Sequence, residues 1–388
     1  MLKIILPTAI LFSMNTFAQV HQSNIISFKW EKVASLPPSK GQAKSPGFAG
    51  PINGVSHDVF ITAGGANFPN AMPWEGGKKY YSDEIYLLEK KGQEYIWKSH
   101  NQKLPEPIAY CGVTSTPMGI VCVGGENEEG LSKKSFLITW DAKPQTLLIK
   151  QLPDLPVALT NVAVANHENT IYAAGGDEAN KSSNTFFTLN LNDKNPAWES
   201  LPDLPFALAN ATLIFQKDKV YLIGGRTKTK TGISDLHGTT FAYSPKLKTW
   251  TKLADICDGK NPTNLSAAAG IALGNDYILM IGGDNGKTFH QIETYLSKIA
   301  QSDTDVKKEK LIKEKNSLVI NHKGFSKKLL LYHIPSNCWT GAGEYPFFAQ
   351  VTTTAVRWND KIIVSNGEIK PGIRTPDVIE GEVLNKHE

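Results

Sequence analysis

The segment VYLIGG, residues 220–225, is an apolar run that ends in two glycines, and the same pattern returns along the whole chain. The other copies are FITAGG (60–65), IVCVGG (120–125), IYAAGG (171–176), ILMIGG (278–283) and IIVSNG (362–367), the last with Asn for the first Gly. The copies recur roughly every fifty residues, with a longer last gap, and this period with Gly-Gly at the end of an apolar run is typical of kelch repeats. The pattern predicts a β-propeller.

Each copy has companions that complete a four-stranded unit. A second apolar segment follows, such as EIYLLE or TTFAYS, and then a segment that is often opened by Trp. The tryptophans are Trp97, Trp198, Trp250 and Trp339. One four-stranded sheet cannot bury both of its faces, so such units must pack side by side in a ring.

The two ends of the chain predict how the ring closes. The sixth unit lacks its Trp segment, because the chain ends after DVIEGEVLNKHE, and FKWEKVASLPP (28–38, with Trp30) supplies one at the other end. We therefore expect an all-β, six-bladed kelch propeller whose N-terminal strand closes the C-terminal blade. Closure removes a sheet edge that would otherwise pair with other chains.

The long gap before the sixth copy predicts an insertion over about residues 284–325, in blade five. Phe289, Ile292, Leu296 and Ile299 are spaced as on one face of a helix, and DVKKEKLIKEKNSLVI (305–320) follows a capping segment. This helical hairpin would leave the blade on the Gly-Gly side, either as a lid or as a solvated decoration.

Composition and the N-terminus narrow the class of protein. The 388 residues carry a net charge of +4 without a dense basic run, so nucleic acid is not expected as a partner. Residues 1–18 read as a signal peptide whose apolar stretch is too short to span a bilayer. We expect secretion, into a periplasm if the host has one, no membrane insertion, and a propeller over residues 19–388.

The sequence carries no motif for a metal or cofactor. The four cysteines (Cys111, Cys122, Cys257 and Cys338) lack metal-binding spacing and are expected in the core, although the first two could meet in one hairpin. No GxSxG motif, P-loop or His-rich metal spacing occurs. We therefore expect no cofactor and no metal.

Charged residues follow the Gly-Gly turns. Because the blades are equivalent, the residues directly after each copy should surround one mouth of the central channel. They are Ala66, Glu126, Asp177, Arg226, Asp284 and Glu368, of which five are charged. Such a ring beside a cavity is a candidate site, although Asp and Glu there could instead accept backbone N–H groups in tight turns.

The sixth copy leads into the most distinctive charged segment, NGEIKPGIRT (366–375). It carries Glu368, Lys370 and Arg374 around a Pro-Gly turn. The turn should fold the guanidinium back towards the carboxylate.

This segment resembles the signature of the N-acetylneuraminate epimerases, secreted kelch propellers that act as sialic acid mutarotases. Further resemblance lies in GFAGPINGVSHDVFITAGGANF, EGGKKYYSDEIYLLE, GVTSTPMGIVCVGGE and FSKKLLLYHIPSNCWTGAGEYPFF. The order differs, because the equivalent of GFAGPINGV falls near the C-terminus in that family, so the chain resembles a cyclically permuted branch. A closed ring tolerates such permutation. PIAYCGVT also lacks an Arg that the family carries near this point.

The resemblance implies roles for individual residues. Glu368 matches the catalytic Glu, proposed as a proton acceptor, and Arg374 matches the Arg of the same motif. The positions that match as substrate-binding residues are Lys370, Lys78, Lys79, Tyr81 and Glu126, and the charged ring adds Arg226 and Asp284.

The expected function is a cofactor-independent interconversion of the anomers of N-acetylneuraminate, by ring opening with Glu368 as the base. Two alternatives stay open: a non-catalytic kelch propeller that binds a glycan or protein on the same face, and a mutarotase of another sugar.

Overall fold

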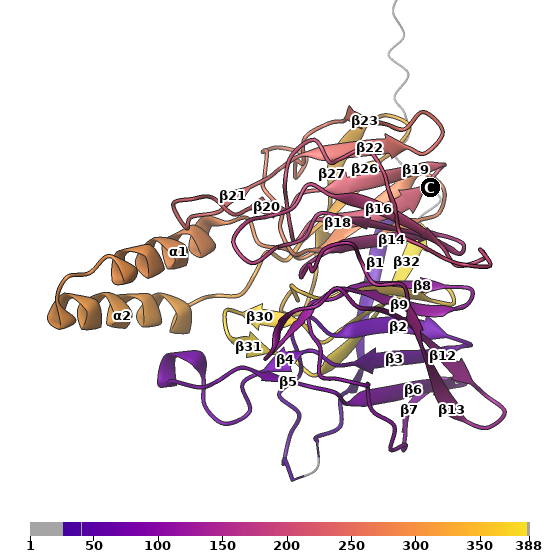
Figure 1. The fold of residues 1–388 in the computed structure, drawn as a ribbon, viewed down its shortest axis with the longest axis horizontal. Coiled ribbons are helices and arrows are strands. Elements are labelled where there is room, and N and C mark those ends of the chain that lie inside the picture. The colour runs from indigo at the N-terminus through magenta and orange to yellow at the C-terminus, as the bar shows by residue number, and fades with distance from the viewer. Residues whose placement is uncertain (1–25, 40, 386–388) are drawn as a thin grey trace, which may run out of the picture.

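The computed structural model describes residues 26–39 and 41–385, and six four-stranded antiparallel sheets arranged as blades make up most of it (Figure 1). The predicted six-bladed propeller is confirmed. The predicted signal peptide over residues 1–18 lies outside the described residues. None of the helices in the described part of the chain combines the length and apolar character needed to cross a membrane.

The first three blades follow each other along the chain, each running from the channel outwards. Blade one contains β2 (Ile52–Ser56), β3 (Val59–Ala63), β6 (Ile85–Lys91) and β7 (Glu94–Lys98). Blade two contains β8 (Gly112–Thr116), β9 (Gly119–Val123), β12 (Ser135–Asp141) and β13 (Thr146–Leu152). Blade three contains β14 (Ala163–His167), β15 (Thr170–Ala174), β16 (Phe186–Asn190) and β17 (Glu199–Ser200).

The last three blades repeat this order, with one strand taken from the other end of the chain. Blade four contains β18 (Thr212–Gln216), β19 (Lys219–Ile223), β22 (Thr240–Ser244) and β23 (Thr249–Lys252). Blade five contains β24 (Ala269–Leu273), β25 (Tyr277–Ile281), β26 (Lys328–His333) and β27 (Cys338–Glu344). Blade six contains β28 (Ala355–Trp358), β29 (Lys361–Ser365), β32 (Asp377–Asn385) and β1 (Ile26–Ser35).

The ring closes as the chain ends predict. β1 pairs antiparallel with β32 in a register that runs from Ile26 opposite Asn385 to Ser35 opposite Asp377. N- and C-terminal segments therefore share one sheet, and the closure holds blade six together across nearly the full length of the chain.

The core lies between the blades. Six apolar clusters occupy the six blade interfaces, because successive residues of an inner strand face opposite neighbours. In β3, Phe60 packs with Trp358 of blade six, and the next residue, Ile61, packs with Ile120 of blade two. Inner strands buried on both faces explain the unbroken apolar runs before each Gly-Gly pair.

In blade six, the backbone explains why Asn stands at the first position of the pair while Gly remains at the second. The first position has φ near that of the left-handed helical region, 65° at Gly224 and 60° at Asn366, which Asn tolerates. The second position has φ of 100° at Gly225 and 95° at Gly367, and a Cβ at Gly367 would lie 2.8 Å from the Val351 carbonyl oxygen. The sixth copy keeps the glycine that the turn requires.

Short elements follow the Gly-Gly turns at one end of the propeller. Two-stranded ribbons form in four blades: β4 (Ala66–Asn67) with β5 (Tyr80–Tyr81), β10 (Glu126–Asn127) with β11 (Gly130–Leu131), β20 (Arg226–Thr227) with β21 (Asp235–Leu236), and β30 (Glu368–Lys370) with β31 (Ile373–Arg374). Blade five has α1 (Lys287–Ala300) and α2 (Asp305–Ile320) instead, which confirms the predicted helical insertion. Figure 1 shows the helices projecting from the end of the propeller that carries β20–β21 and β30–β31.

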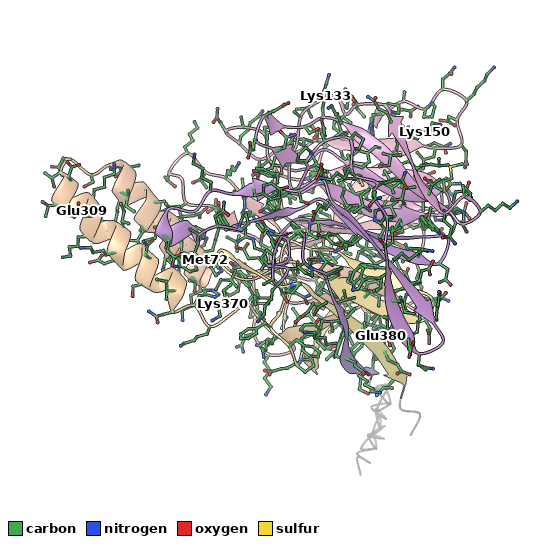
Figure 2. All side chains as sticks on the ribbon, turned by 90° about the horizontal axis from the view of Figure 1, so that it is seen from below. Met72, Lys133, Lys150, Glu309, Lys370 and Glu380 are labelled. Carbon is green, nitrogen blue, oxygen red and sulfur yellow. The ribbon has the colours of Figure 1, made fainter. Side chains whose placement is uncertain are left out.

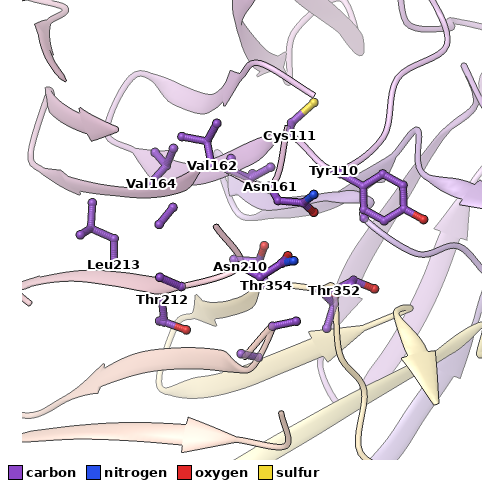
Figure 3. Close-up of a pocket in the computed structure, with 18 of the residues that line it drawn as sticks. Tyr110, Cys111, Asn161, Val162, Val164, Asn210, Thr212, Leu213, Thr352 and Thr354 are labelled. Carbon is purple, nitrogen blue, oxygen red and sulfur yellow. The ribbon is translucent and has the colours of Figure 1, made fainter. Parts of the chain in front are cut away.

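A closed cycle of backbone hydrogen bonds surrounds the channel just below these elements. In each blade, the residue that enters the first strand has φ between 51° and 60° and donates its N–H to the carbonyl oxygen of the equivalent residue of the neighbouring blade. The six residues are Gly50, Tyr110, Asn161, Asn210, Ala267 and Thr352. Residues of all six blades line the central cavity, among them Asn161, Asn210 and Thr352 of the cycle and the apolar Val164 and Leu213 (Figure 3). The cycle forms a rigid floor for the mouth above it.

Candidate active site

The charged residues after the Gly-Gly turns occupy equivalent places around the mouth. Each forms an antiparallel bridge with the residue just before the hydrogen-bonded cycle. The bridged pairs are Ala49–Ala66, Ala109–Glu126, Thr160–Asp177, Ala209–Arg226, Ser266–Asp284 and Val351–Glu368. The backbone thus sets all six positions at the same height, and the side chains decide which of them interact.

Glu368 and Arg374 meet across the β30–β31 ribbon. The two residues are paired in register, and Arg374 Nη1 lies 3.4 Å from Glu368 Oε1. The same Oε1 accepts a hydrogen bond from the Gly372 N–H at 2.5 Å. Since both contacts use Oε1, the Oε2 atom has no hydrogen-bond partner within the described residues.

Arg374 is buried to an unusual degree for an arginine. Its side chain is only 5% exposed, its guanidinium lies 4.7 Å from the centre of the Phe68 ring, and its Nε donates to the Ala66 carbonyl oxygen at 3.3 Å. Nη1 is buried and has no hydrogen-bond partner among the described residues, so its contact with Glu368 is an ion pair without a hydrogen bond. A buried charged donor that lacks a hydrogen bond is costly, and an anionic ligand would supply one.

A second cluster joins blades one and two. Glu126 Oε1 accepts a hydrogen bond from Tyr81 at 2.7 Å and from the Lys79 ammonium at 3.2 Å. Burial and the bond to Glu126 raise the pKa of Tyr81 to about 12. Burial lowers the pKa of Lys79, but Tyr110 and Glu126 outweigh burial, and the pKa lies above its ordinary value. Lys78, by contrast, is exposed and takes no part in these contacts.

A third cluster is a closed ion pair between blades three and four. The Arg226 guanidinium contacts the Asp177 carboxylate with Nη2 2.6 Å from Oδ2, and Ser182 donates to Oδ1 at 3.1 Å. Lys228 adds a longer contact of 3.6 Å. The Asp177 side chain is 2% exposed and that of Arg226 is 12% exposed. This pair holds Arg226 in place in the wall of the mouth.

We expect Asp177→Asn to lower the free energy of unfolding by about 3 kcal/mol, because it leaves the charge of Arg226 without its buried partner. Glu106→Gln is the matched control, since Glu106 pairs with Lys134 on the surface and such pairs contribute about 1 kcal/mol or less. Urea unfolding at pH 7 measures both. Equal losses in the two variants would show that the Asp177–Arg226 pair does not stabilise the fold.

The fourth group belongs to blade five and its insertion. Asp284 Oδ1 accepts the Gly286 N–H at 2.8 Å, and burial raises the pKa of Asp284 although Gly286 and two histidines oppose it. One of these is His322, whose pKa is lowered by burial. The Lys370 ammonium lies 5.7 Å from the centre of the Phe348 ring. Lys370 lies close to the helices of the insertion (Figure 2).

Sequence reasoning missed Tyr110. Its ring packs on Gly50, where a Cβ would lie 2.4 Å from Tyr110 Cδ1, and the Lys79 ammonium lies 5.2 Å from the ring centre. Burial raises the pKa of Tyr110, Lys79 and Arg374 lower it, and Glu368 raises it further. Tyr110 thus stands among the candidate site residues. Its φ of 57° is unfavourable for an aromatic residue. The sequence could have pointed to Tyr110, because it occupies the same position in its repeat as Asn161 and Asn210 do in theirs.

Two adjoining cavities open at the mouth and share Arg226. One, of about 240 Å³, is lined by Glu368, Asp284 and His322 together with apolar side chains of the insertion. The other, of about 360 Å³, is polar and is lined by Lys79, Glu126 and other residues of blades two to four. Small-molecule sites typically have volumes of roughly 300–1,000 Å³, so the two cavities together suit a small polar ligand.

No cluster of three or more His, Cys, Asp or Glu side chains in residues 26–39 and 41–385 could hold a metal ion. All four cysteines are free. The prediction that they lie in the core is wrong for Cys338, which is exposed in β27 because its side chain alternates with that of the buried Trp339.

The fold and the mouth define the class: a six-bladed kelch propeller whose channel mouth holds a buried carboxylate–guanidinium pair. A family model described as N-acetylneuraminate epimerase matches residues 13–147 and 152–388. The chain belongs to the N-acetylneuraminate epimerase family.

Individual relatives are more distant. A protein of Haemophilus influenzae (strain PittEE) is 28% identical over 249 residues, which are 64% of this chain and 62% of the relative. One of Salmonella typhi is 30% identical over 237 residues, 59% of this chain and 57% of the relative. One of Brucella melitensis biotype 1 is 36% identical over 124 residues, 29% of this chain and 31% of the relative. All three are named N-acetylneuraminate epimerase, and the chain spans less than two thirds of each.

Proposed function

We propose that this protein is a cofactor-independent mutarotase, an isomerase that interconverts the α and β anomers of N-acetylneuraminate. The observation that carries the proposal is the buried Arg374 guanidinium, which has an unpartnered Nη1 beside a carboxylate with a free Oε2. The free Nη1 can bind the carboxylate of a sugar acid, and the free Oε2 can accept a proton. Family membership and the names of the relatives support the same substrate.

Glu368 acts as the base in this mechanism. Its Oε2 takes the proton of the anomeric hydroxyl, the bond between the anomeric carbon and the ring oxygen breaks, and a water molecule supplies a proton to the ring oxygen. The open-chain keto acid then rotates about the adjacent carbon–carbon bond, and the former ring oxygen attacks the other face of the carbonyl. As the ring closes, the attacking hydroxyl gives its proton back to water and Glu368 returns its proton to the carbonyl oxygen. A positioned carboxylate contributes on the order of 10²- to 10⁴-fold to such a proton transfer.

Arg374 binds and orients the substrate. Its planar guanidinium suits the sugar's carboxylate, and its burial strengthens this charged hydrogen bond. The Gly372 N–H and the register of the ribbon fix Glu368 beside it, so that the anomeric carbon, which carries the carboxylate, is held next to the base. Lys79, Arg226 and Lys370 add positive charge around the mouth. Glu126, which accepts a hydrogen bond from Tyr81, lines the polar cavity of the mouth.

We expect the rate enhancement to depend on the acid group of the sugar. Anomer exchange should be accelerated for N-acetylneuraminate and not for glucose or galactose, because a neutral sugar has no carboxylate to accept a hydrogen bond from the buried Nη1 of Arg374. Exchange NMR with each sugar at equal concentration measures this. Equal acceleration of neutral hexoses would assign the protein to another sugar, and binding of N-acetylneuraminate without acceleration would identify a non-catalytic propeller.

Secretion is part of the proposal. It rests on the sequence of residues 1–18, and the same residues suggest a periplasmic location in a host with an outer membrane. The cyclic permutation of the family's blade order likewise remains a proposal from the sequence.

A further inference from the structure

The helical insertion builds one wall of the smaller cavity at the mouth. Phe289 and Ile292 of α1 and Phe325, which follows α2, line it together with Leu236 of β21. Glu368 lines the same cavity. The proposed base therefore faces a largely apolar recess that the insertion supplies.

Among the polar side chains that line this recess, His322 and Asp284 belong to blade five and its insertion. His322 Nδ1 accepts the Gly324 N–H at 3.0 Å, so the neutral imidazole carries its proton on Nε2. Asp284 uses Oδ1 for the Gly286 N–H, and within the described residues its Oδ2 has no hydrogen-bond partner. The two side chains are close enough for each to affect the titration of the other. His322 and Asp284 together thus offer the recess one N–H donor and one carboxylate acceptor.

A secondary amide with a small acyl group has the complementary chemistry: one N–H, one carbonyl oxygen and one apolar methyl. In N-acetylneuraminate the amide-bearing carbon lies across the six-membered ring from the anomeric carbon. A sugar held with its anomeric end at Glu368 therefore points its amide away from that residue, into the rest of the cavity.

We infer that this recess binds the N-acyl group of the substrate and sets the specificity for it, an inference that rests on the proposed mutarotase function. Asp284 Oδ2 accepts the amide N–H, and His322 Nε2 donates to the amide carbonyl oxygen. The methyl group packs against Phe289, Ile292 and Phe325.

The wall is fixed in position before the substrate arrives. Glu293 of α1 accepts hydrogen bonds from the N–H and the hydroxyl of Ser234, each at 2.7 Å, and His290 Nε2 contacts the Ser234 carbonyl oxygen at 2.6 Å. Asn316 of α2 donates to the Trp74 carbonyl oxygen at 3.4 Å. Contacts to blades four and one anchor the hairpin over the mouth, and a rigid wall is what selection by shape requires.

The test compares three sugar acids that differ only at this position: N-acetylneuraminate, its N-glycolyl analogue, and the deaminated analogue with a hydroxyl in place of the amide. The wild-type protein is expected to show kcat/KM about 10-fold to 100-fold lower for the N-glycolyl acid, whose extra hydroxyl enters an apolar recess, and at least about 100-fold lower for the deaminated acid, which leaves Asp284 and His322 unpaired. Exchange NMR at several concentrations gives kcat and KM.

Ile292→Ser tests the wall, and Leu296→Ser is its matched control, one helical turn further along and 50% exposed. We expect Ile292→Ser to raise KM for N-acetylneuraminate about 10-fold with kcat nearly unchanged. The increase in KM should be smaller for the N-glycolyl acid. Leu296→Ser should have the same kinetics as the wild type. Asp284→Ala should lose the preference for the amide over the deaminated acid. Thermal unfolding confirms that each variant is folded.

Equal kcat/KM for the three acids in the wild type, or equal kinetics of Ile292→Ser and Leu296→Ser, would overturn the assignment of the recess and leave the mutarotase function standing. Acceleration of none of the three acids would overturn the proposed function and this inference together.

Discussion

Glu368→Gln is expected to fold and to lose at least about 100-fold of the acceleration of anomer exchange, with a loss of up to 10⁴-fold if Glu368 is the sole base. The amide oxygen of Gln can still accept the Gly372 N–H, so the ribbon keeps its shape. The amide cannot take a proton from the anomeric hydroxyl. Exchange NMR of N-acetylneuraminate with equal amounts of variant and wild type measures the loss.

Glu89→Gln is the matched control for this variant. Like Glu368, Glu89 is a partly buried carboxylate that pairs with a cationic side chain, in this case Lys98. Glu89 lies on β6 in blade one. The control should retain full activity. Thermal unfolding should show a modest decrease in stability for Glu368→Gln, because Arg374 loses its neighbouring charge. Wild-type rates in the folded Glu368→Gln protein would remove Glu368 from the mechanism.

Removal of residues 26–38 is expected to abolish the folded monomer. The deletion removes β1, exposes the whole edge of β32, and takes away Trp30, whose ring packs on Gly381 and lies 4.9 Å edge-on from Tyr345. An exposed edge of this length pairs readily with other chains. Size-exclusion chromatography should find aggregate or degraded protein.

A chain that starts at residue 25 keeps β1 and serves as the control, which should remain a soluble, folded protein. Circular dichroism and thermal unfolding of the two proteins give the comparison. A monomeric shortened chain with the same unfolding temperature as the control would show that β1 does not close the ring.

Most of the fold could be predicted because it is periodic. Each Gly-Gly pair marks the end of a strand whose side chains face two neighbouring blades, so one correct unit fixes the others. The closure followed from counting: the last unit lacked a Trp strand and the first segment supplied one. Even the meeting of Glu368 and Arg374 could be expected, since the Pro-Gly turn lies between them in one short ribbon.

The pairing of side chains around the mouth could not be predicted, because it depends on contacts between blades. Glu126 lies 47 residues from Lys79, and Asp177 lies 49 residues from Arg226, so sequence proximity gives no sign of either pair. In both clusters, charged side chains pair with each other, although nothing in the sequence indicates that they are neighbours. The repeat determines the course of the backbone in each blade, whereas the length of the ribbon and the side-chain rotamers differ from blade to blade.

The contribution of the insertion was also beyond the sequence. Helical spacing predicted two helices, but a lid and a solvated decoration remained equally open. The structure shows α1 anchored by Glu293 and its apolar residues lining a cavity with Glu368. His322 escaped notice because a single histidine in a loop carries no pattern, and only its position beside Asp284 singles it out.

The decay of freshly released α-N-acetylneuraminate, followed by proton NMR, shows directly whether this propeller is a mutarotase that depends on the Glu368–Arg374 pair. With the wild-type protein, treated with a chelator beforehand, the α anomer should reach equilibrium faster than in buffer, at a rate proportional to protein concentration. With Glu368→Gln the decay should approach the spontaneous rate. The same rate of decay with and without the wild-type protein would show that this propeller is not a mutarotase of N-acetylneuraminate.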